Sequence, residues 1–195
     1  MSGKFKVSVI GVGHLGSIHA RLWSNLSGEA LAGVYDADAE RANSIAKEIG
    51  TKAFSTLDEA FSSANAVTIA VPTTLHFEVA MQAIQRGIHC LIEKPITQTY
   101  AEAQELIRAA RQKGVTVQVG HVERFNPSIA AIKNLGISPL FIEAHRLSQF
   151  KPRAIDVSVI HDLMIHDIDI ALWLAKSPVE SISANGVAVL TETTD

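Results

Sequence analysis

The sequence predicts an α/β protein with a doubly wound parallel sheet, followed by a smaller, incomplete α+β domain with an open sheet. Two observations carry this prediction. Short apolar runs rich in β-branched residues alternate with helical patterns as far as Gly120, which is typical of parallel strands covered on both faces. Beyond Gly120 the alternation stops and longer, more polar segments begin. We therefore predict two domains, residues 1–122 and 123–195.

Nearly continuous apolar runs of this length suit buried strands. The predicted strands are 5–10, 30–35, 66–71, 88–92 and 115–119. The segments between them repeat apolar residues every three or four positions, as Leu106, Ala109 and Ala110 do, and are predicted as helices. These helices are 15–26, 38–49, 74–86 and 99–113.

The second domain is predicted to be more antiparallel. Residues 126–135 and 159–175 read as helices, and 139–149 and 179–190 read as strands. Side chains alternate along 139–149 in a way that suggests one wetter face. Two strands and a helix would be marginally stable alone.

Composition excludes several classes of protein. The chain has 195 residues, 47% hydrophobic and 19% charged, with a formal net charge of −3. This balance argues against a nucleic acid as the main partner, and no apolar run reaches the roughly 18 residues of a membrane span. The lone Cys90 excludes an intrachain disulfide and reads as a core residue. The first residues lead directly into a strand without a signal-peptide pattern, so we expect a cytoplasmic location and a small-molecule substrate.

A glycine-rich turn follows the first predicted strand and opens the first helix. Gly11, Gly13 and Gly16 form the pattern GxGxxG, with His14 and Leu15 inside it. The first glycine permits a tight turn, the second lets the backbone approach a pyrophosphate, and the third allows close packing of helix and strand. In this context the motif predicts a dinucleotide site at the helix N-terminus, rather than a purely structural turn.

The second predicted strand ends at Asp36, 20 residues beyond Gly16. A carboxylate at this point accepts hydrogen bonds from the adenosine ribose hydroxyls and repels a 2′-phosphate. No arginine follows directly in the segment Asp36-Ala37-Asp38. The sequence therefore favours NAD over NADP, and the alternative reading of Asp36 is a helix N-cap.

Two segments that contain polar residues follow the next two strands, at the edge of the sheet where ligands bind in open α/β folds. They are Val71-Pro72-Thr73-Thr74-Leu75-His76 after one strand and Glu93-Lys94-Pro95 after the other. The Lys94 ammonium could point at the substrate or the nicotinamide. A surface lysine paired with Glu93 is the competing interpretation.

The densest titratable cluster lies in residues 161–169. In a helix, Asp162 and His166 would share one face, where the carboxylate orients an imidazole that exchanges a proton with a hydroxyl. A solvated polar face is the alternative. A metal site is disfavoured because His161 and His166 are five residues apart and would project differently.

Together these motifs resemble the Gfo/Idh/MocA family of nicotinamide-dependent oxidoreductases along the whole chain. The matching segments are 11–20, Asp36, 71–80, 93–97, 120–127 and 162–170, in the family's order. The resemblance implies a Rossmann domain that holds NAD and an α+β domain that covers the substrate and forms a homo-oligomer through its sheet. It also implies that Lys94, Asp162 and His166 flank the reacting carbon. The cofactor-binding residues it implies are Gly11, Gly13, His14, Leu15, Gly16, Asp36, Val71, Pro72, Thr73, His76, Glu93 and Lys94.

Within the family, GHVERFNP and DLMIHDIDI are most similar to members that oxidise the sugar 3-hydroxyl of UDP-N-acetylglucosamine or related UDP-sugars. Those members feed the synthesis of bacterial surface glycolipids such as lipopolysaccharide. The implied substrate-binding residues are Lys94, Arg124, Asn126, Asp162 and His166. For Arg124, a structural ion pair is an equal alternative.

Two departures from the family pattern bear on function. Val157-Ser158 stands where many members carry a Gly-Gly pair, and the chain ends at Asp195 where members continue. We expect a fragment, a short form or a unit completed by a partner. The rival functions are an NAD-dependent glycoside hydrolase and a non-catalytic dinucleotide-binding remnant.

Overall fold

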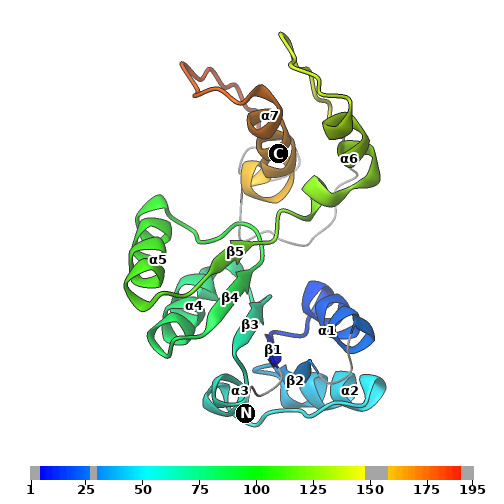
Figure 1. Cartoon of the computed structure of the whole chain (residues 1–195), viewed down its shortest axis with the longest axis vertical. Coiled ribbons are helices and arrows are strands. Elements are labelled where there is room, and N and C mark those ends of the chain that lie inside the picture. Colours follow the sequence, from blue (N-terminus) through cyan, green and yellow to red (C-terminus); the bar gives the residue numbers. More distant parts are fainter. Residues whose placement is uncertain (1–4, 27–29, 148–157, 190–195) are drawn as a thin grey trace. The chain divides into compact units, whose positions relative to one another are not determined.

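A computed structural model of the chain describes residues 5–26, 30–147 and 158–189 (Figure 1). Contacts divide the protein into two compact units, Met1–Gly120 and His121–Asp195. The units are described separately below.

The first unit is built on a parallel sheet of five strands. They are β1 (Val7–Ile10), β2 (Leu31–Tyr35), β3 (Ala66–Ile69), β4 (His89–Ile92) and β5 (Val117–Val119), in the spatial order β2-β1-β3-β4-β5. All five coincide with predicted strands, and the predicted doubly wound fold is confirmed. The order reverses between β1 and β3, so the loops that follow these strands lie at the point where such sheets bind ligands.

Helices cover both faces of this sheet (Figure 1). They are α1 (His14–Leu26), α2 (Ala39–Ile49), α3 (Leu57–Ser62), α4 (His76–Gln85) and α5 (Tyr100–Lys113). Neighbouring residues of β1 point to opposite faces: Val9 packs in a cluster with α1 and α2, and Ile10 in a cluster with α3, α4 and α5. Burial on both sides explains why the strands read as continuous apolar runs.

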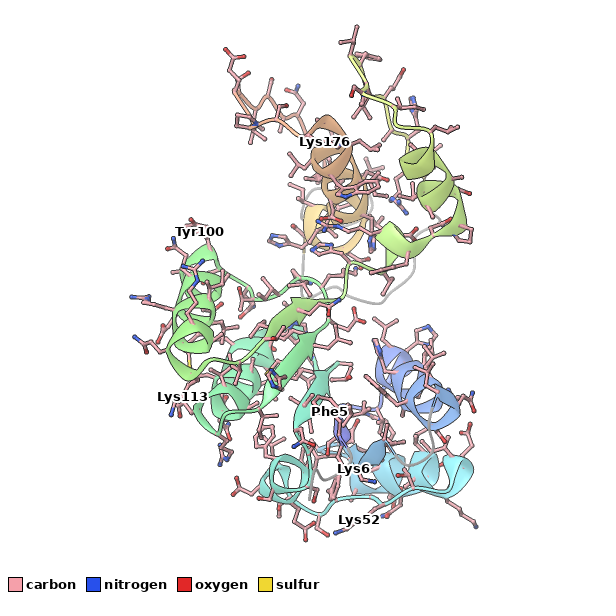
Figure 2. The ribbon with its side chains drawn as sticks, in the orientation of Figure 1. Phe5, Lys6, Lys52, Tyr100, Lys113 and Lys176 are labelled. Atoms are coloured by element: carbon pink, nitrogen blue, oxygen red, sulfur yellow. The ribbon has the colours of Figure 1, made fainter. Side chains whose placement is uncertain are left out.

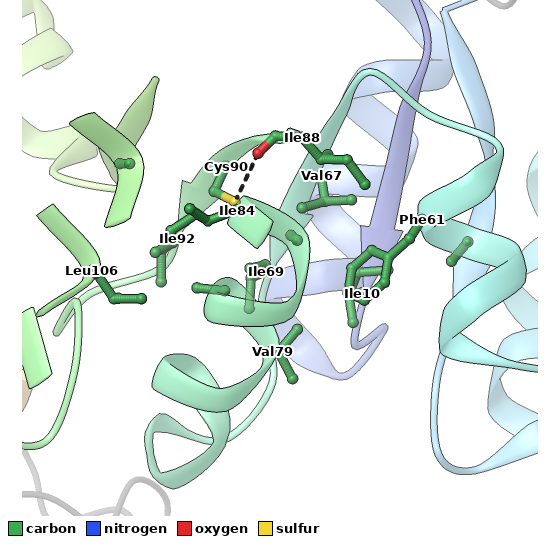
Figure 3. Packing of buried hydrophobic residues seen from close by; sticks show 14 of the residues in the cluster. Ile10, Phe61, Val67, Ile69, Val79, Ile84, Ile88, Cys90, Ile92 and Leu106 are labelled. Carbon is green, nitrogen blue, oxygen red and sulfur yellow. Dashed lines mark hydrogen bonds between the residues drawn. The ribbon is translucent and has the colours of Figure 1, made fainter. Parts of the chain in front are cut away.

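Cys90 lies in the larger of these clusters, beside Val67, Ile84 and Ile92 (Figure 3). Its side chain is buried, and its thiol lies 3.6 Å from the carbonyl oxygen of Ile88. Burial raises the pKa of the Cys90 thiol to about 12, so almost no reactive thiolate forms near neutral pH.

We therefore expect iodoacetamide to leave Cys90 unmodified in the native protein and to alkylate it rapidly in denaturant. Peptide mass spectrometry at matched, mildly alkaline pH would measure both rates. Equal rates in the two conditions would contradict the buried placement.

In the described residues of the second unit, the regular elements are all helical and the segments 137–147 and 176–189 are irregular. A short 3-10 turn (Val122–Phe125) precedes α6 (Pro127–Asn134), and a π-helical turn (Ile160–Met164) leads directly into α7 (Ile165–Ala175). The two predicted helices are thus present, but the second begins as a π turn.

The strands predicted at 139–149 and 179–190 are not formed within 139–147 and 179–189, where the structure describes them. A strand requires a neighbour for its backbone hydrogen bonds, and neither segment has a paired strand among the described residues. Leu140 and Phe141 are both exposed, so the expected alternation between two faces is absent as well. Residues 148–149 and 190 lie outside the described residues, as does Val157.

Candidate functional site

The glycine turn after β1 is held by its own packing. Gly11 has φ +80° and donates its N–H to the Tyr35 carbonyl at 2.7 Å. A Cβ on Gly11 would lie 2.8 Å from the carbonyl oxygen of Ala70 at the end of β3. A Cβ on Gly16 would overlap the carbonyl oxygen of Gly11. Two of the three glycines are therefore required by the fold itself, one by its backbone conformation and one by close packing.

Gly13 differs from its two neighbours in the motif. A Cβ there would meet no atom of residues 5–26, 30–147 and 158–189 within 4 Å, and the residue does not have a positive φ. None of these residues requires glycine at this position. The open space beside the N-terminus of α1 fits a bound pyrophosphate that needs close approach to the backbone.

We expect Gly13→Ala to leave the thermal unfolding temperature nearly unchanged while weakening NAD binding by about tenfold or more. The methyl group would occupy space that only a ligand uses. Isothermal titration calorimetry with NAD and thermal unfolding monitored by circular dichroism would separate the two effects. An unchanged dissociation constant would remove Gly13 from the cofactor site.

The other motif residues, His14 and Leu15, lie exposed in the first turn of α1. Their side chains do not pack into the core. Their backbone N–H groups belong to the first turn of α1, where a helix leaves such donors without an intrahelical partner, so their role in cofactor binding stays a prediction.

Asp36 directly follows β2 and is fixed by its neighbours. One carboxylate oxygen accepts the Val12 N–H at 2.8 Å, and the other accepts the Asp38 N–H at 2.9 Å. The Arg41 guanidinium lies 3.2 Å from Asp36 and 3.1 Å from Asp38. Arg41 Nη1 donates to both Asp36 oxygens, at 3.2 and 3.4 Å, so a ribose diol would have to replace Arg41 to hydrogen-bond this carboxylate. Arg41 lies in the first turn of α2, five residues after Asp36, so the segment Asp36-Ala37-Asp38 alone gives no sign of this pairing.

The β3–α4 loop carries the next group of predicted residues. Val71 and Pro72 lead into a 3-10 turn (Thr73–Leu75), in which the Thr73 side chain is buried. His76, at the start of α4, is 1% exposed. Its Nδ1 lies 2.8 Å from the Pro95 carbonyl oxygen and its Nε2 lies 3.0 Å from the Val71 carbonyl oxygen. The ring of His76 is thus enclosed by the protein, and the predicted role of His76 in cofactor binding stays a prediction.

The turn after β4 carries Glu93 and Lys94, followed by a cis peptide bond to Pro95. The Glu93 carboxylate lies 2.6 Å from Nε2 of His19 on α1, and it accepts the Lys94 backbone N–H at 3.2 Å. Burial alone would raise the pKa of Glu93. The hydrogen bond and charge of His19, together with the N–H and charge of Lys94, outweigh burial and hold that pKa below its usual value. Lys94 itself is half-buried.

In the second unit, Asp162 lies in the π turn and His166 in the first turn of α7. Both side chains are half-buried. The π turn is closed by the Ile165 N–H, which donates to the Ile160 carbonyl five residues earlier. The predicted spacing of four residues on a regular α-helical face therefore does not apply unchanged to Asp162 and His166.

Arg124 forms a bidentate ion pair with Asp169, with its Nε 2.6 Å from the carboxylate. Burial alone would raise the pKa of Asp169, but the hydrogen bond from Arg124 and the charges of His121, Arg124 and His166 lower it. The Asn126 amide donates to Glu123 at 3.2 Å. These contacts favour the structural ion-pair interpretation of Arg124.

The structure thus brings the predicted cofactor residues to the carboxyl edge of one sheet. Lys94 lies at that edge, whereas Asp162 and His166 belong to the second unit. Among residues 5–26, 30–147 and 158–189, no group of three or more His, Cys, Asp or Glu residues is arranged to hold a metal ion. In the same residues, no helix is long and apolar enough to span a membrane.

A parallel sheet with a glycine turn and an acidic residue at its switch point defines a dinucleotide-binding protein of the Rossmann class. The sequence model GFO_IDH_MocA, described as "Oxidoreductase family, NAD-binding Rossmann fold", matches residues 5–121. The chain belongs to this family.

Two curated relatives extend the similarity beyond the first unit. UDP-N-acetylglucosamine 3-dehydrogenase of Acidithiobacillus ferrooxidans is 44% identical over 97% of this chain and 60% of its own length. Inositol 2-dehydrogenase of Leifsonia xyli is 32% identical over 91% of this chain and 55% of its own length. A solved structure of the Acidithiobacillus enzyme superposes with a TM-score of 0.92, at 43% identity, over 97% of this chain and 62% of the solved chain. The chain spans less than two thirds of the length of these relatives.

Proposed function

We propose that the protein is an NAD-dependent sugar dehydrogenase that acts on the 3-hydroxyl of a UDP-N-acetylhexosamine. The observation that carries the proposal is the 44% identity to UDP-N-acetylglucosamine 3-dehydrogenase, which covers 97% of the chain and therefore both units. The relatives described above are dehydrogenases, so the glycoside hydrolase reading is not favoured.

The glycine turn and Asp36 would hold the cofactor. Gly13 leaves room for a pyrophosphate, the N-terminus of α1 supplies N–H groups, and Asp36 accepts hydrogen bonds from the ribose. When bound, NAD supplies the electron acceptor for oxidation of a carbinol carbon.

The protein's own residues would handle the proton and the charge. His166 takes the proton of the substrate hydroxyl as general base, and Asp162 orients its imidazole. The Lys94 ammonium stabilises the negative charge that develops on the substrate oxygen. Val71, Pro72 and Thr73 would contact the nicotinamide, and Arg124 and Asn126 would contact the substrate, although Arg124 is already paired with Asp169.

The proposal extends to the location of the protein, its oligomeric state and the use of its product. A cytoplasmic homo-oligomer that uses a nucleotide sugar would supply an intermediate for lipopolysaccharide. The resemblance to family members with this role supports the link to lipopolysaccharide. The free, buried Cys90 is consistent with the cytoplasmic location.

The test is turnover of the purified chain with NAD and UDP-N-acetylglucosamine, followed by NADH absorbance and by mass spectrometry of the product. We expect NADH and a 3-keto sugar nucleotide in equal amounts. Release of free sugar without net NADH would instead indicate a hydrolase. Binding of NAD without either product would indicate a non-catalytic domain.

Replacing His166 with asparagine is expected to lower kcat by about 10²-fold or more, because the general base is removed. His161→Asn is the matched control, since His161 is exposed in the adjacent π turn. Equal kcat values for the two variants, measured by NADH formation, would exclude His166 as the base.

A further inference from the structure

Two histidines from different helices contact the residues on either side of Lys94. His19 comes from α1 and contacts the Glu93 side chain, and His76 comes from α4 and contacts the Pro95 carbonyl. His19 is not among the predicted site residues, and His76 is predicted to bind the cofactor although its ring is buried. Neither residue has a part in the proposed chemical step.

His76 links two loops at the carboxyl edge of the sheet. Its Nδ1 lies 2.8 Å from the carbonyl oxygen of Pro95, the residue after Lys94. Its Nε2 lies 3.0 Å from the carbonyl oxygen of Val71, two residues after β3. Both partners can only accept hydrogen bonds, so a neutral imidazole donates to one of the two carbonyls and lies in close contact with the other. At 1% exposure the ring has little access to water. The ring therefore fixes the spacing between the β3–α4 loop and the turn that carries Lys94.

His19 restrains the same turn from the other side. Its Nε2 lies 2.6 Å from one Glu93 oxygen, while the second Glu93 oxygen accepts the backbone N–H of Lys94. The carboxylate is further confined at Gly120, where an added Cβ would lie 3.1 Å from it. The Lys94 backbone is thus tied to the helix that the glycine turn opens.

We propose that His19 and His76 are positioning residues that fix the Lys94 backbone relative to the two cofactor loops. The proposal rests on the role proposed for Lys94 and adds the reason why its ammonium lies where the reaction needs it. Displacement of a catalytic group by about 1 Å can lower a rate by about 10²-fold without changing the affinity for the ligand. Loss of either histidine should consequently affect kcat far more than KM.

The experiment compares His76→Leu and His19→Leu with His89→Leu. His89 is the matched control because it also bonds the backbone, accepting the Thr116 N–H at 2.9 Å, but at the opposite end of β4. The readouts are amide hydrogen exchange resolved by peptide, the dissociation constant of NAD, and kcat and KM with UDP-N-acetylglucosamine.

For His76→Leu and His19→Leu we expect amides in 93–97 to exchange about tenfold faster, with amides of α5 unchanged. We expect kcat to fall by tenfold to about a hundredfold and KM and NAD affinity to change by less than about threefold. His89→Leu should leave exchange in 93–97 and kcat at wild-type values. His76→Gln, whose amide still donates to a carbonyl, should recover part of both losses.

Unchanged exchange in 93–97 and unchanged kcat in both leucine variants would overturn the positioning role. The variant Lys94→Met shows whether such unchanged values mean that the positioning role is wrong or that the proposed function of Lys94 is wrong. If Lys94→Met abolishes turnover while the histidine variants retain it, only the positioning role is wrong. If Lys94→Met retains turnover, the proposed function of Lys94 is wrong, and hydrogen exchange still decides whether the histidines fix the turn. Should the leucine variants fail to fold, His76→Gln and His19→Gln carry the same comparison.

Discussion

Replacing Lys94 with methionine is expected to lower kcat for UDP-N-acetylglucosamine oxidation by about 10²- to 10³-fold. Methionine keeps the length and the apolar stem of the side chain but removes the positive charge that we propose stabilises the developing negative charge on the substrate oxygen. NAD affinity should change little, because the glycine turn and Asp36 carry most of the predicted cofactor contacts. Initial rates of NADH formation and calorimetric titration with NAD would measure the two quantities.

Lys113→Met is the matched control for this substitution. Lys113 is exposed at the end of α5, remote in sequence from the turn after β4 (Figure 2). We expect the control to keep wild-type kcat. A Lys94→Met variant with the same kcat as Lys113→Met would show that the lysine is a surface residue without a role in the reaction.

Gly16→Ala is expected to have the largest effect on stability. The added Cβ would overlap the carbonyl oxygen of Gly11 and lie 3.3 Å from the Ala70 Cβ, so α1 would have to move away from β1 and β3. Backbone atoms cannot yield as the end of a flexible side chain can. We expect a loss of about 3 kcal/mol or more in the free energy of unfolding, a large part of the roughly 5–15 kcal/mol that stabilises a typical domain.

Urea unfolding monitored by circular dichroism would measure this loss, with Gly13→Ala as the control in the same turn. A Cβ at Gly13 would point into open space, whereas a Cβ at Gly16 would meet the backbone of Gly11. Comparing the two variants therefore separates an effect on protein packing from an effect on ligand binding. If Gly16→Ala unfolded at the wild-type urea concentration, the close approach of α1 to β1 would be wrong.

The sheet could be predicted because its strands carry their own signal. Strands buried on both faces read as apolar runs, and β1 and β3 stand out in this way. Helix α3 was missed because six residues are too few to show a helical period. Its only signal was Thr56, whose hydroxyl caps the Glu59 N–H three residues later.

The second unit was harder to predict because its local pattern depends on distant partners. Alternating side chains in 139–147 suit a strand, but a strand forms only when another backbone pairs with it. The π turn at Ile160–Met164 also leaves no mark in the residue pattern, since its extra residue per turn is a matter of hydrogen bonding alone.

Within the candidate site, the residues that the backbone conformation requires could be predicted from the sequence. The contacts between side chains that lie far apart in the sequence could not. Gly11, Gly16 and Asp36 follow from the geometry of a turn between a strand and a helix. The pairing of His19 with Glu93 joins residues 74 positions apart, and no spacing rule connects them. For the same reason, only the fold shows that the ring of His76 is buried.

The strand order also determines when, during synthesis of the chain, β1 can pair with both of its neighbouring strands. β1 is central: it pairs with β2 on one side and with β3 on the other, and Ala70 donates its N–H to the Ile10 carbonyl beside the glycine turn. Residues 66–70 must therefore leave the ribosome before this turn can take its final form. At about 5–20 residues per second, the roughly 60 residues after Ile10 need about 3–12 s. During that interval the first strand of the nascent chain is an apolar segment without its second neighbour, and it is the part of this protein that a chaperone would be expected to shield.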